Sequence, residues 1–151
     1  RRAADIRALI EGAGLSVAQR SQQETVTSDT QVYLVDTMGE MPMWYRAAGA
    51  TFVAGSFAAK GGHTPFEPAA YGTAILHGPD TSNFRRIYRD LDTAQAALPV
   101  QNASDLATAV TRALADRSFY AQRATKVIQA STDLDPLVDR ILERLPPANV
   151  D

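Results

Sequence analysis

The sequence has 151 residues, no cysteine, 45% hydrophobic and 21% charged residues, and a formal net charge of −2. These values are typical of one globular domain, and they exclude a disulfide framework and a thiolate metal site. The near-neutral charge disfavours binding to nucleic acid, and no apolar run approaches the roughly 20 residues of a membrane-spanning helix.

The first half of the sequence predicts alternating helices and strands. Apolar residues at helical spacing, such as Ile6, Leu9 and Ile10, favour a helix, whereas the run QVYLVD favours a buried strand. The expected elements are a helix over 2–11, a strand over 15–20, a polar loop over 21–30, a buried strand over 31–36, a helix over 42–49, a buried strand over 50–55, a loop over 56–63, a helix over 65–71 and a strand over 73–78.

The second half continues the alternation and then becomes helical. A helix is expected over 84–91 and a weaker strand over 94–100. Three apolar stripes at helical spacing follow within 106–114, 124–128 and 137–145, with helix starts expected at Ser104, at Ser118 and at Asp135 with Pro136.

Strands that alternate with helices imply a parallel sheet with helices on both faces, so we expect a Rossmann-like α/β fold. Such a fold normally opens with a strand, whereas this sequence opens with a predicted helix. We therefore expect a piece of a longer protein whose first strand is missing. In such sheets ligands bind beyond the carboxyl ends of the strands, which selects the loops after Asp36, Gly55 and Gly78.

The segment GGHTPFEP, residues 61–68, allows two interpretations. In the first it is a capping box, with Thr64 accepting from the third helical N–H, Pro65 opening the helix and Glu67 reaching back. In the second, free N–H groups and the Gly61-Gly62 loop form an anion site, and Glu67 accepts hydrogen bonds from ribose hydroxyls. Spacing alone leaves both interpretations open.

The segment DTMGE, residues 36–40, raises the same choice. It is a turn in which Asp36 caps and the charge of Glu40 favours the next helix, or it is a binding loop. In a binding loop the backbone of Met38 and Gly39 would face a base or a phosphate, because glycine permits close approach.

Other polar residues carry weaker signals. The two histidines have no neighbouring carboxylates at metal-ligand spacing, so we expect no metal, and we expect His77 to be structural. A nucleophile built from Ser56 and His63 is disfavoured. The arginines at 85, 86 and 89 favour a solvated helix face over one that contacts anionic lipid.

Five segments, in this order and spacing, resemble the C-terminal half of 3-deoxy-D-manno-octulosonic acid (Kdo) transferases. The family pattern reads DTMGEL, FVGGSL, GGHNPLEPA, then GP and NF. The corresponding segments here are DTMGE (36–40), WYR (44–46), FVAGS (52–56), KGGHTPFEPAAYG (60–72) and GPDTSNF (78–84).

The resemblance implies the donor-binding half of a GT-B glycosyltransferase, covering residues 1–151, with the N-terminal acceptor half missing. The complete enzyme would transfer Kdo from CMP-Kdo to a lipid A precursor at the cytoplasmic face of the inner membrane, and this domain itself would be soluble. The alternatives are a GT-B transferase for another nucleotide sugar and a non-catalytic nucleotide-binding module.

The family's CMP contacts map onto matching positions of this sequence. They are Met38, Gly39, Glu40, Thr64, Pro65, Phe66 and Glu67. From the sequence itself we add, as supporting positions next to these contacts, Ser56, Lys60, Gly61, Gly62 and His63. The resemblance implies no catalytic residue, no cofactor and no metal in this chain.

This sequence departs from the family pattern at several positions. Among them, Thr64 replaces the usual Asn, Phe66 replaces Leu, and Ala54 replaces Gly. A further Pro-Arg contact of the family lies upstream of the first helix, so we expect impaired donor affinity. The resemblance places the catalytic base in the N-terminal half, so we expect no sugar transfer by this half alone.

Overall fold

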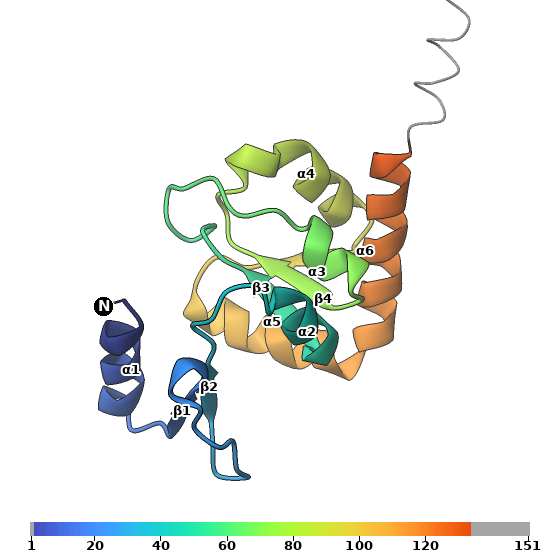
Figure 1. The fold of residues 1–151 in the computed structure, drawn as a ribbon. Coiled ribbons are helices and arrows are strands. Elements are labelled where there is room, and N and C mark those ends of the chain that lie inside the picture. Colours follow the sequence, from blue (N-terminus) through green and yellow to red (C-terminus); the bar gives the residue numbers. More distant parts are fainter. Residues whose placement is uncertain (1, 134–151) are drawn as a thin grey trace, which may run out of the picture. The chain divides into compact units, whose positions relative to one another are not determined.

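The computed structural model describes residues 2–133 (Figure 1). The chain forms two compact units, Arg1–Met41 and Pro42–Asp151, and each is described here by itself. In the described part no helix is long and apolar enough to cross a membrane. The third expected apolar stripe, at 137–145, lies outside the described residues.

The first unit is a small α/β element. Its parts are α1 (Arg2–Gly12), β1 (Val17–Gln19), the 3-10 turn η1 (Arg20–Gln22) and β2 (Val32–Leu34). The two strands are parallel, with Val17 opposite Val32. The expected helix and strands are confirmed, but β2 is only half-buried. Because β2 pairs with β1 alone in a two-stranded sheet, it has an open edge and cannot be enclosed as a central strand is.

The second unit is a three-stranded parallel sheet with helices on both sides. Its sheet has the order β3-β4-β5. The elements, in chain order, are α2 (Met41–Ala47), β3 (Ala50–Val53), α3 (Phe66–Ala70), β4 (Ala74–His77), the 3-10 turn η2 (Ser82–Phe84), α4 (Arg85–Thr93), β5 (Ala97–Pro99), α5 (Ala103–Ala115) and α6 (Arg117–Thr132).

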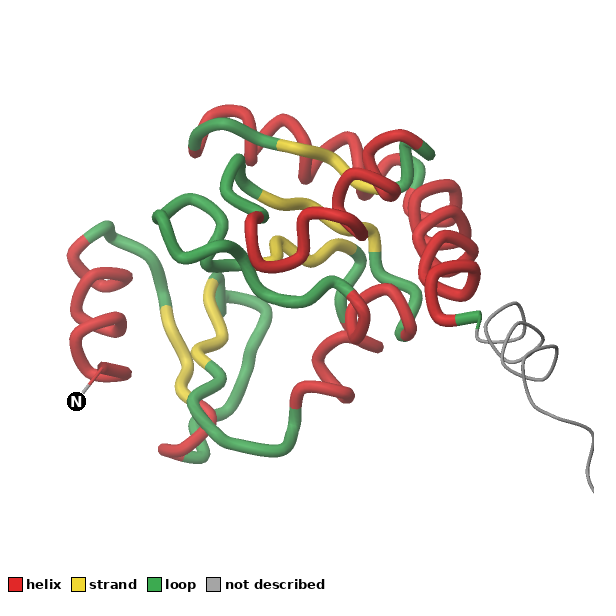
Figure 2. Tube along the Cα trace, turned by 90° about the horizontal axis from the view of Figure 1, so that it is seen from above, coloured by secondary structure: helices red, strands yellow, loops and turns green. Residues whose placement is uncertain are grey.

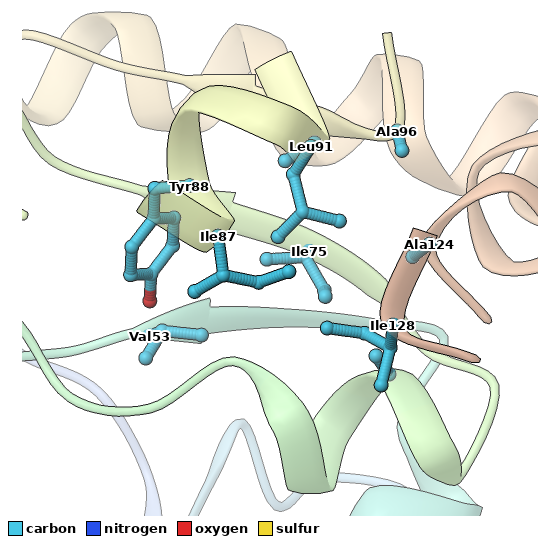
Figure 3. Close-up of a cluster of buried hydrophobic side chains, with 10 residues drawn as sticks. Val53, Ile75, Ile87, Tyr88, Leu91, Ala96, Ala124 and Ile128 are labelled. Carbon is cyan, nitrogen blue, oxygen red and sulfur yellow. The ribbon is translucent and has the colours of Figure 1, made fainter. Parts of the chain in front are cut away.

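Two hydrophobic clusters cover the two faces of this sheet. Side chains alternate across a strand, so Ile75 of β4 joins one cluster while Ala74 and Leu76 join the other. The first cluster packs against α3, α4 and α6, and Figure 3 shows Ile75, Ile87 and Ile128 converging there. The second packs against α5 and the first turns of α6. Figures 1 and 2 show the strands between these helices, which confirms the predicted Rossmann-like arrangement.

Some element boundaries differ from the sequence-based predictions. The helix start expected at Ser104 is wrong, because Asn102 caps α5 by accepting from the Asp105 N–H at 2.9 Å. The start expected at Ser118 lies one residue earlier, since α6 begins at Arg117 directly after α5. The strand expected over 94–100 is shortened at its beginning because Gln95 adopts a positive φ of 52°.

Candidate functional site

Two loops meet beyond the carboxyl ends of β3 and β4, and Ser56 joins them. Its hydroxyl donates to the carbonyl of Val53 at 2.8 Å and accepts from the N–H of Gly78, also at 2.8 Å. The backbone of Asp80 donates to the Ser56 carbonyl at 2.9 Å. Ser56 is fully buried, so its side chain connects the loops and does not face solvent. Ser56 can therefore support the site only by holding the two loops in place, and not by contacting a ligand with its side chain.

The glycine loop, residues 60–63, is held from outside by side chains of the next loop and helix. The carboxylate of Asp80 accepts from the Gly61 N–H at 2.7 Å. The amide of Asn83 donates to the Lys60 carbonyl at 2.9 Å, and the Tyr88 hydroxyl donates to the His63 carbonyl at 2.8 Å. The conformation of the loop thus depends on residues about 20 positions later in the chain.

Sequence reasoning did not assign roles to Asp80, Asn83 or Tyr88. The signal was present, because parallel neighbouring strands bring the loops that follow them to one edge of the sheet. The segment GPDTSNF contributes to the family resemblance without predicting a role for any one of its residues. Nothing in its spacing indicates which of its polar side chains reach the glycine loop.

The predicted capping box at the start of α3 is wrong in its details. Thr64 Oγ1 accepts from the Phe66 N–H at 3.3 Å, not from the N–H of Glu67. The Glu67 carboxylate does not reach back and makes no hydrogen bond with any residue in the described part of the chain. The N-cap of α3 is Pro65 and not Thr64, and the helix begins at Phe66. Thr64 thus accepts one N–H at the helix start from the position before the N-cap, and the carboxylate half of the predicted box is absent.

Because the Glu67 carboxylate makes no hydrogen bond with a described residue, it is available to bind a ligand. Glu67 is exposed, and the backbone N–H groups of Thr64 and Glu67 donate to no described residue. Pro65 is fully buried, and Phe66 is half-buried against the first hydrophobic cluster. The segment thus presents two N–H donors and one carboxylate on a support made by Pro65 and Phe66.

The short length of α3 limits its electrostatic contribution. With five residues it aligns few peptide dipoles, so its macrodipole adds little to the binding of an anion. The anion site expected from free N–H groups and the Gly61-Gly62 loop therefore gains little from a helix dipole. A phosphate here would be held by individual N–H groups and not by a helix end.

Two tyrosines lie near Glu67. The rings of Tyr45 and Tyr71 stack with centroids 6.0 Å apart, and the Arg46 guanidinium lies 5.0 Å from the centre of the Tyr71 ring. Burial raises the pKa of Tyr45, and the negative charge of Glu67 raises it further. The segment WYR therefore supplies one of these two tyrosines, Tyr45, and Tyr71 comes from the end of the segment KGGHTPFEPAAYG.

The remaining residues of the loops divide into exposed and structural ones. Lys60 and His63 are exposed, and Lys60 forms no ion pair with a described residue. His77 is buried, with Nδ1 2.8 Å from the Gly78 carbonyl and Nε2 3.0 Å from Oδ1 of Asp92. The expectation that His77 is structural is confirmed by these contacts.

The DTMGE loop belongs to the first unit. The Glu40 carboxylate accepts from Arg20, with the closest contact at 2.8 Å, and also from the Thr37 hydroxyl. Gly39 has a φ of +83°, a conformation that favours glycine, and Met38 is 97% exposed. Because the Glu40 carboxylate already accepts from Arg20, a ligand that bonds to this carboxylate would share it with the guanidinium. This contact of Arg20 was not predicted from the sequence.

Asp36 does not cap a helix. Its carboxylate accepts from the hydroxyl of Ser21 at 2.7 Å, from the Ser21 N–H at 3.0 Å and from the Gln19 amide at 2.7 Å. These contacts, led by the Ser21 hydroxyl, lower the pKa of Asp36. Asp36 therefore ties the end of β1 to the DTMGE loop.

The predicted site residues thus form two groups. Ser56 and the residues from Lys60 to Glu67 lie within one stretch of the second unit, residues 56–67, whereas Met38, Gly39 and Glu40 belong to the first. Across residues 2–133, no group of three or more His, Asp or Glu side chains is placed to hold a metal ion.

Comparison with known proteins identifies relatives of this chain. No protein-family model matches. The 3-deoxy-D-manno-octulosonic acid transferase of Bordetella pertussis is 43% identical over 108 residues, which are 71% of this chain and 24% of that protein. The enzyme of the same name from Haemophilus influenzae is 39% identical over 87 residues, 58% of this chain and 20% of that protein. The chain thus spans a fifth to a quarter of these relatives.

A solved structure is similar to most of the chain. The C-terminal CMP-Kdo binding domain of WaaA from Acinetobacter baumannii matches 85% of this chain and 68% of that chain, with a TM-score of 0.81 and 30% sequence identity. The sequence comparison and the structure comparison thus identify the same protein family. The chain therefore belongs to the 3-deoxy-D-manno-octulosonic acid transferase family.

Proposed function

We propose that this chain is the donor-binding part of a GT-B glycosyltransferase that transfers Kdo from CMP-Kdo to a lipid A precursor. The observation that carries the proposal is the similarity, over 85% of the chain, to a domain described as binding CMP-Kdo. The geometry of the Thr64–Glu67 segment supports it, because that segment offers both anion-binding and hydroxyl-binding groups.

The free groups of this segment suit the two polar parts of a nucleotide. The Thr64 and Glu67 N–H groups can donate to phosphate oxygens, and the Glu67 carboxylate can accept from the vicinal ribose hydroxyls. Met38, Gly39 and Glu40 are proposed as further contacts, through their backbone, to the base or the phosphate. Pro65 and Phe66 contribute as support, because their side chains face the protein interior.

The chemistry of the complete enzyme would be inverting transfer to an acceptor hydroxyl. A general base must activate that hydroxyl, and the departing CMP phosphate must be stabilised as its charge develops. We assign the second task to this chain and the first to an acceptor-binding half. The lipid acceptor and a location at the cytoplasmic face of the inner membrane are part of the same proposal.

A nucleotide titration tests the donor-binding proposal. Backbone amide shifts should respond at residues 61–67 and 38–40 on addition of CMP, and CMP should bind more tightly than UMP. Glu67→Gln removes the charge that strengthens hydrogen bonds to ribose, so affinity for CMP should fall about tenfold, which corresponds to ~1.4 kcal/mol. Glu11→Gln, an exposed glutamate of α1, is the matched control and should leave affinity unchanged.

The outcomes separate the proposal from its alternatives. Preference for UMP would favour a transferase for another nucleotide sugar, and no response in either segment would contradict nucleotide binding altogether. The chain alone should transfer no Kdo to a lipid acceptor, because the base lies in another half. Measurable turnover by the chain alone would contradict that division of labour.

A further inference from the structure

The loop after β4 carries two polar side chains that the proposed donor site does not use directly. These are Asp80 and Asn83, which lie on either side of η2's first residue, Ser82. Both point their hydrogen bonds at the glycine loop. Resting on the proposed function, we propose that Asp80 and Asn83 are positioning residues that hold the glycine loop in the conformation needed for donor binding.

The carboxylate of Asp80 accepts hydrogen bonds from the glycine loop and from its own loop. Its Oδ2 accepts from the Gly61 N–H at 2.7 Å, while its Oδ1 accepts from the Ser82 hydroxyl at 2.8 Å and the Ser82 N–H at 3.2 Å. These contacts, led by the Gly61 N–H, hold the pKa of Asp80 below its usual range. One carboxylate therefore joins two loops and remains ionised while it does so.

Asn83 fixes the same loop on its other side. Its Nδ2 donates to the Lys60 carbonyl at 2.9 Å and lies 3.4 Å from the Gly62 carbonyl, and its backbone N–H donates to the Gly61 carbonyl at 3.0 Å. Three consecutive carbonyls of the glycine loop thus face one residue. Contacts with three successive carbonyls restrict the backbone conformation of the loop more than a single hydrogen bond would.

Steric fit adds to the hydrogen bonds. Gly61 has a φ of +78°, and a Cβ added there would lie 2.5 Å from both Nδ2 and Oδ1 of Asn83. A Cβ at Gly62, with a φ of +71°, would lie 3.0 Å from the Asp80 carbonyl. The loop therefore packs against Asp80 and Asn83 with no room for a side chain.

The held loop leads directly into the donor segment. His63 is fixed by its own N–H to the Ala54 carbonyl at 3.1 Å and by the Tyr88 hydroxyl. Consecutive Cα atoms are ~3.8 Å apart, so a shift of His63 moves the available N–H of Thr64 with it. The position of that donor group is thus set by Asp80, Asn83 and Tyr88 together.

The expected effect follows from the population of the competent loop. When a variant leaves the loop correctly placed in about one molecule in ten, apparent affinity falls about tenfold. Asn83→Ala removes the side-chain donor and should have this effect on CMP binding. Asp80→Asn keeps its shape and one acceptor oxygen, so it should fold and give a smaller loss of affinity.

The matched control is Asn102→Ala. Asn102 is an exposed asparagine that also bonds to backbone, accepting from the Asp105 N–H at 2.9 Å, but it caps α5 and does not contact the glycine loop. Its loss should lower global stability by an amount similar to the loss of Asn83. We therefore expect CMP affinity within about twofold of the unmodified chain, which separates positioning from general destabilisation.

Two measurements decide the inference. CMP titration should give a Kd about tenfold higher for Asn83→Ala than for the unmodified chain. Hydrogen exchange of this variant without ligand should be faster at the Gly61, Gly62 and His63 amides and unchanged at the Ile75 and Leu76 amides. If the unmodified chain binds CMP and Asn83→Ala binds it equally well, or if exchange of the loop amides does not change, the inference is wrong. If the unmodified chain binds no CMP, the proposed function fails, and the donor role of the loop fails with it.

Discussion

Replacing Gly61 with alanine tests the packing of the glycine loop most directly. The substitution places a Cβ 2.5 Å from two atoms of Asn83, in a backbone conformation with a φ of +78°. Gly72→Ala is a matched control, because Gly72 has nearly the same φ, +72°, and nothing within 4 Å of an added Cβ. Both variants carry the conformational cost, and only Gly61→Ala carries the collision.

The two costs can be separated in magnitude. A left-handed backbone costs an L-residue ~1 to 2 kcal/mol, partly offset by ~0.4 to 1 kcal/mol because alanine restricts the unfolded chain. We therefore expect Gly72→Ala to lower the free energy of unfolding by about 1 kcal/mol. Displacing the exposed Asn83 side chain should add about 1 kcal/mol to Gly61→Ala, from its weakened hydrogen bonds to Lys60 and Gly62.

Urea unfolding followed by fluorescence provides the assay. Trp44 is the sole tryptophan and lies in the same unit as both glycines, so its signal reports the relevant transition. The two variants should show the same m-value and different midpoints. Equal midpoints, within about 0.5 kcal/mol, would refute the close packing of Asn83 against the loop and with it the steric part of the positioning role.

Three further predictions follow from individual contacts. Thr64→Val should weaken CMP binding and remove about 1 kcal/mol of stability, whereas Thr64→Ser should retain both, as measured by titration and urea unfolding. The pKa of Asp80 is lowered in the folded chain, so its ionised carboxylate stabilises the fold at pH values above the ordinary carboxyl pKa. This contribution should be lost as pH falls below about 4. The free energy of unfolding of Asp80→Asn, measured against pH, should therefore fall less steeply at acid pH than that of the unmodified chain. His77→Ala should cost about 2 to 4 kcal/mol in urea unfolding, because it leaves the Gly78 carbonyl unpaired and removes a ring packed 4.6 Å from Tyr88; a loss under about 0.5 kcal/mol would contradict that structural role.

The order of helices and strands could be predicted because their patterns are local. The continuous apolar run of β4 is buried at every position, and the helical spacing of Ile87 and Leu91 places both in one cluster. Boundaries were less predictable where several polar residues compete to cap a helix. Asn102 caps α5 in place of Ser104, a choice that depends on which residue has an extended backbone.

The candidate site was only partly predictable for a different reason. Motif resemblance identified the Thr64–Glu67 segment, and its exposed carboxylate and N–H groups agree with a binding role. The contacts of Asp80, Asn83 and Tyr88 join residues 19 to 25 positions apart, and no periodicity encodes such pairs. Only the pairing of β3 with β4 brings these loops together.

In the proposed donor site, Thr64 could replace the family's asparagine with a shorter side chain that has the same two kinds of hydrogen bond. An asparagine at this position accepts through one atom and donates through another, so it can hold the helix start and a ligand at once. A threonine hydroxyl can also do both, because its oxygen accepts from the Phe66 N–H while its own proton remains free to be donated. The donated proton then comes from an atom closer to the backbone. In the proposed donor site a phosphate would therefore have to approach the Thr64 backbone more closely, where the available N–H groups of Thr64 and Glu67 also lie. Under that proposal the substitution would shift donor binding from side chain towards backbone and would increase its dependence on a correctly held glycine loop.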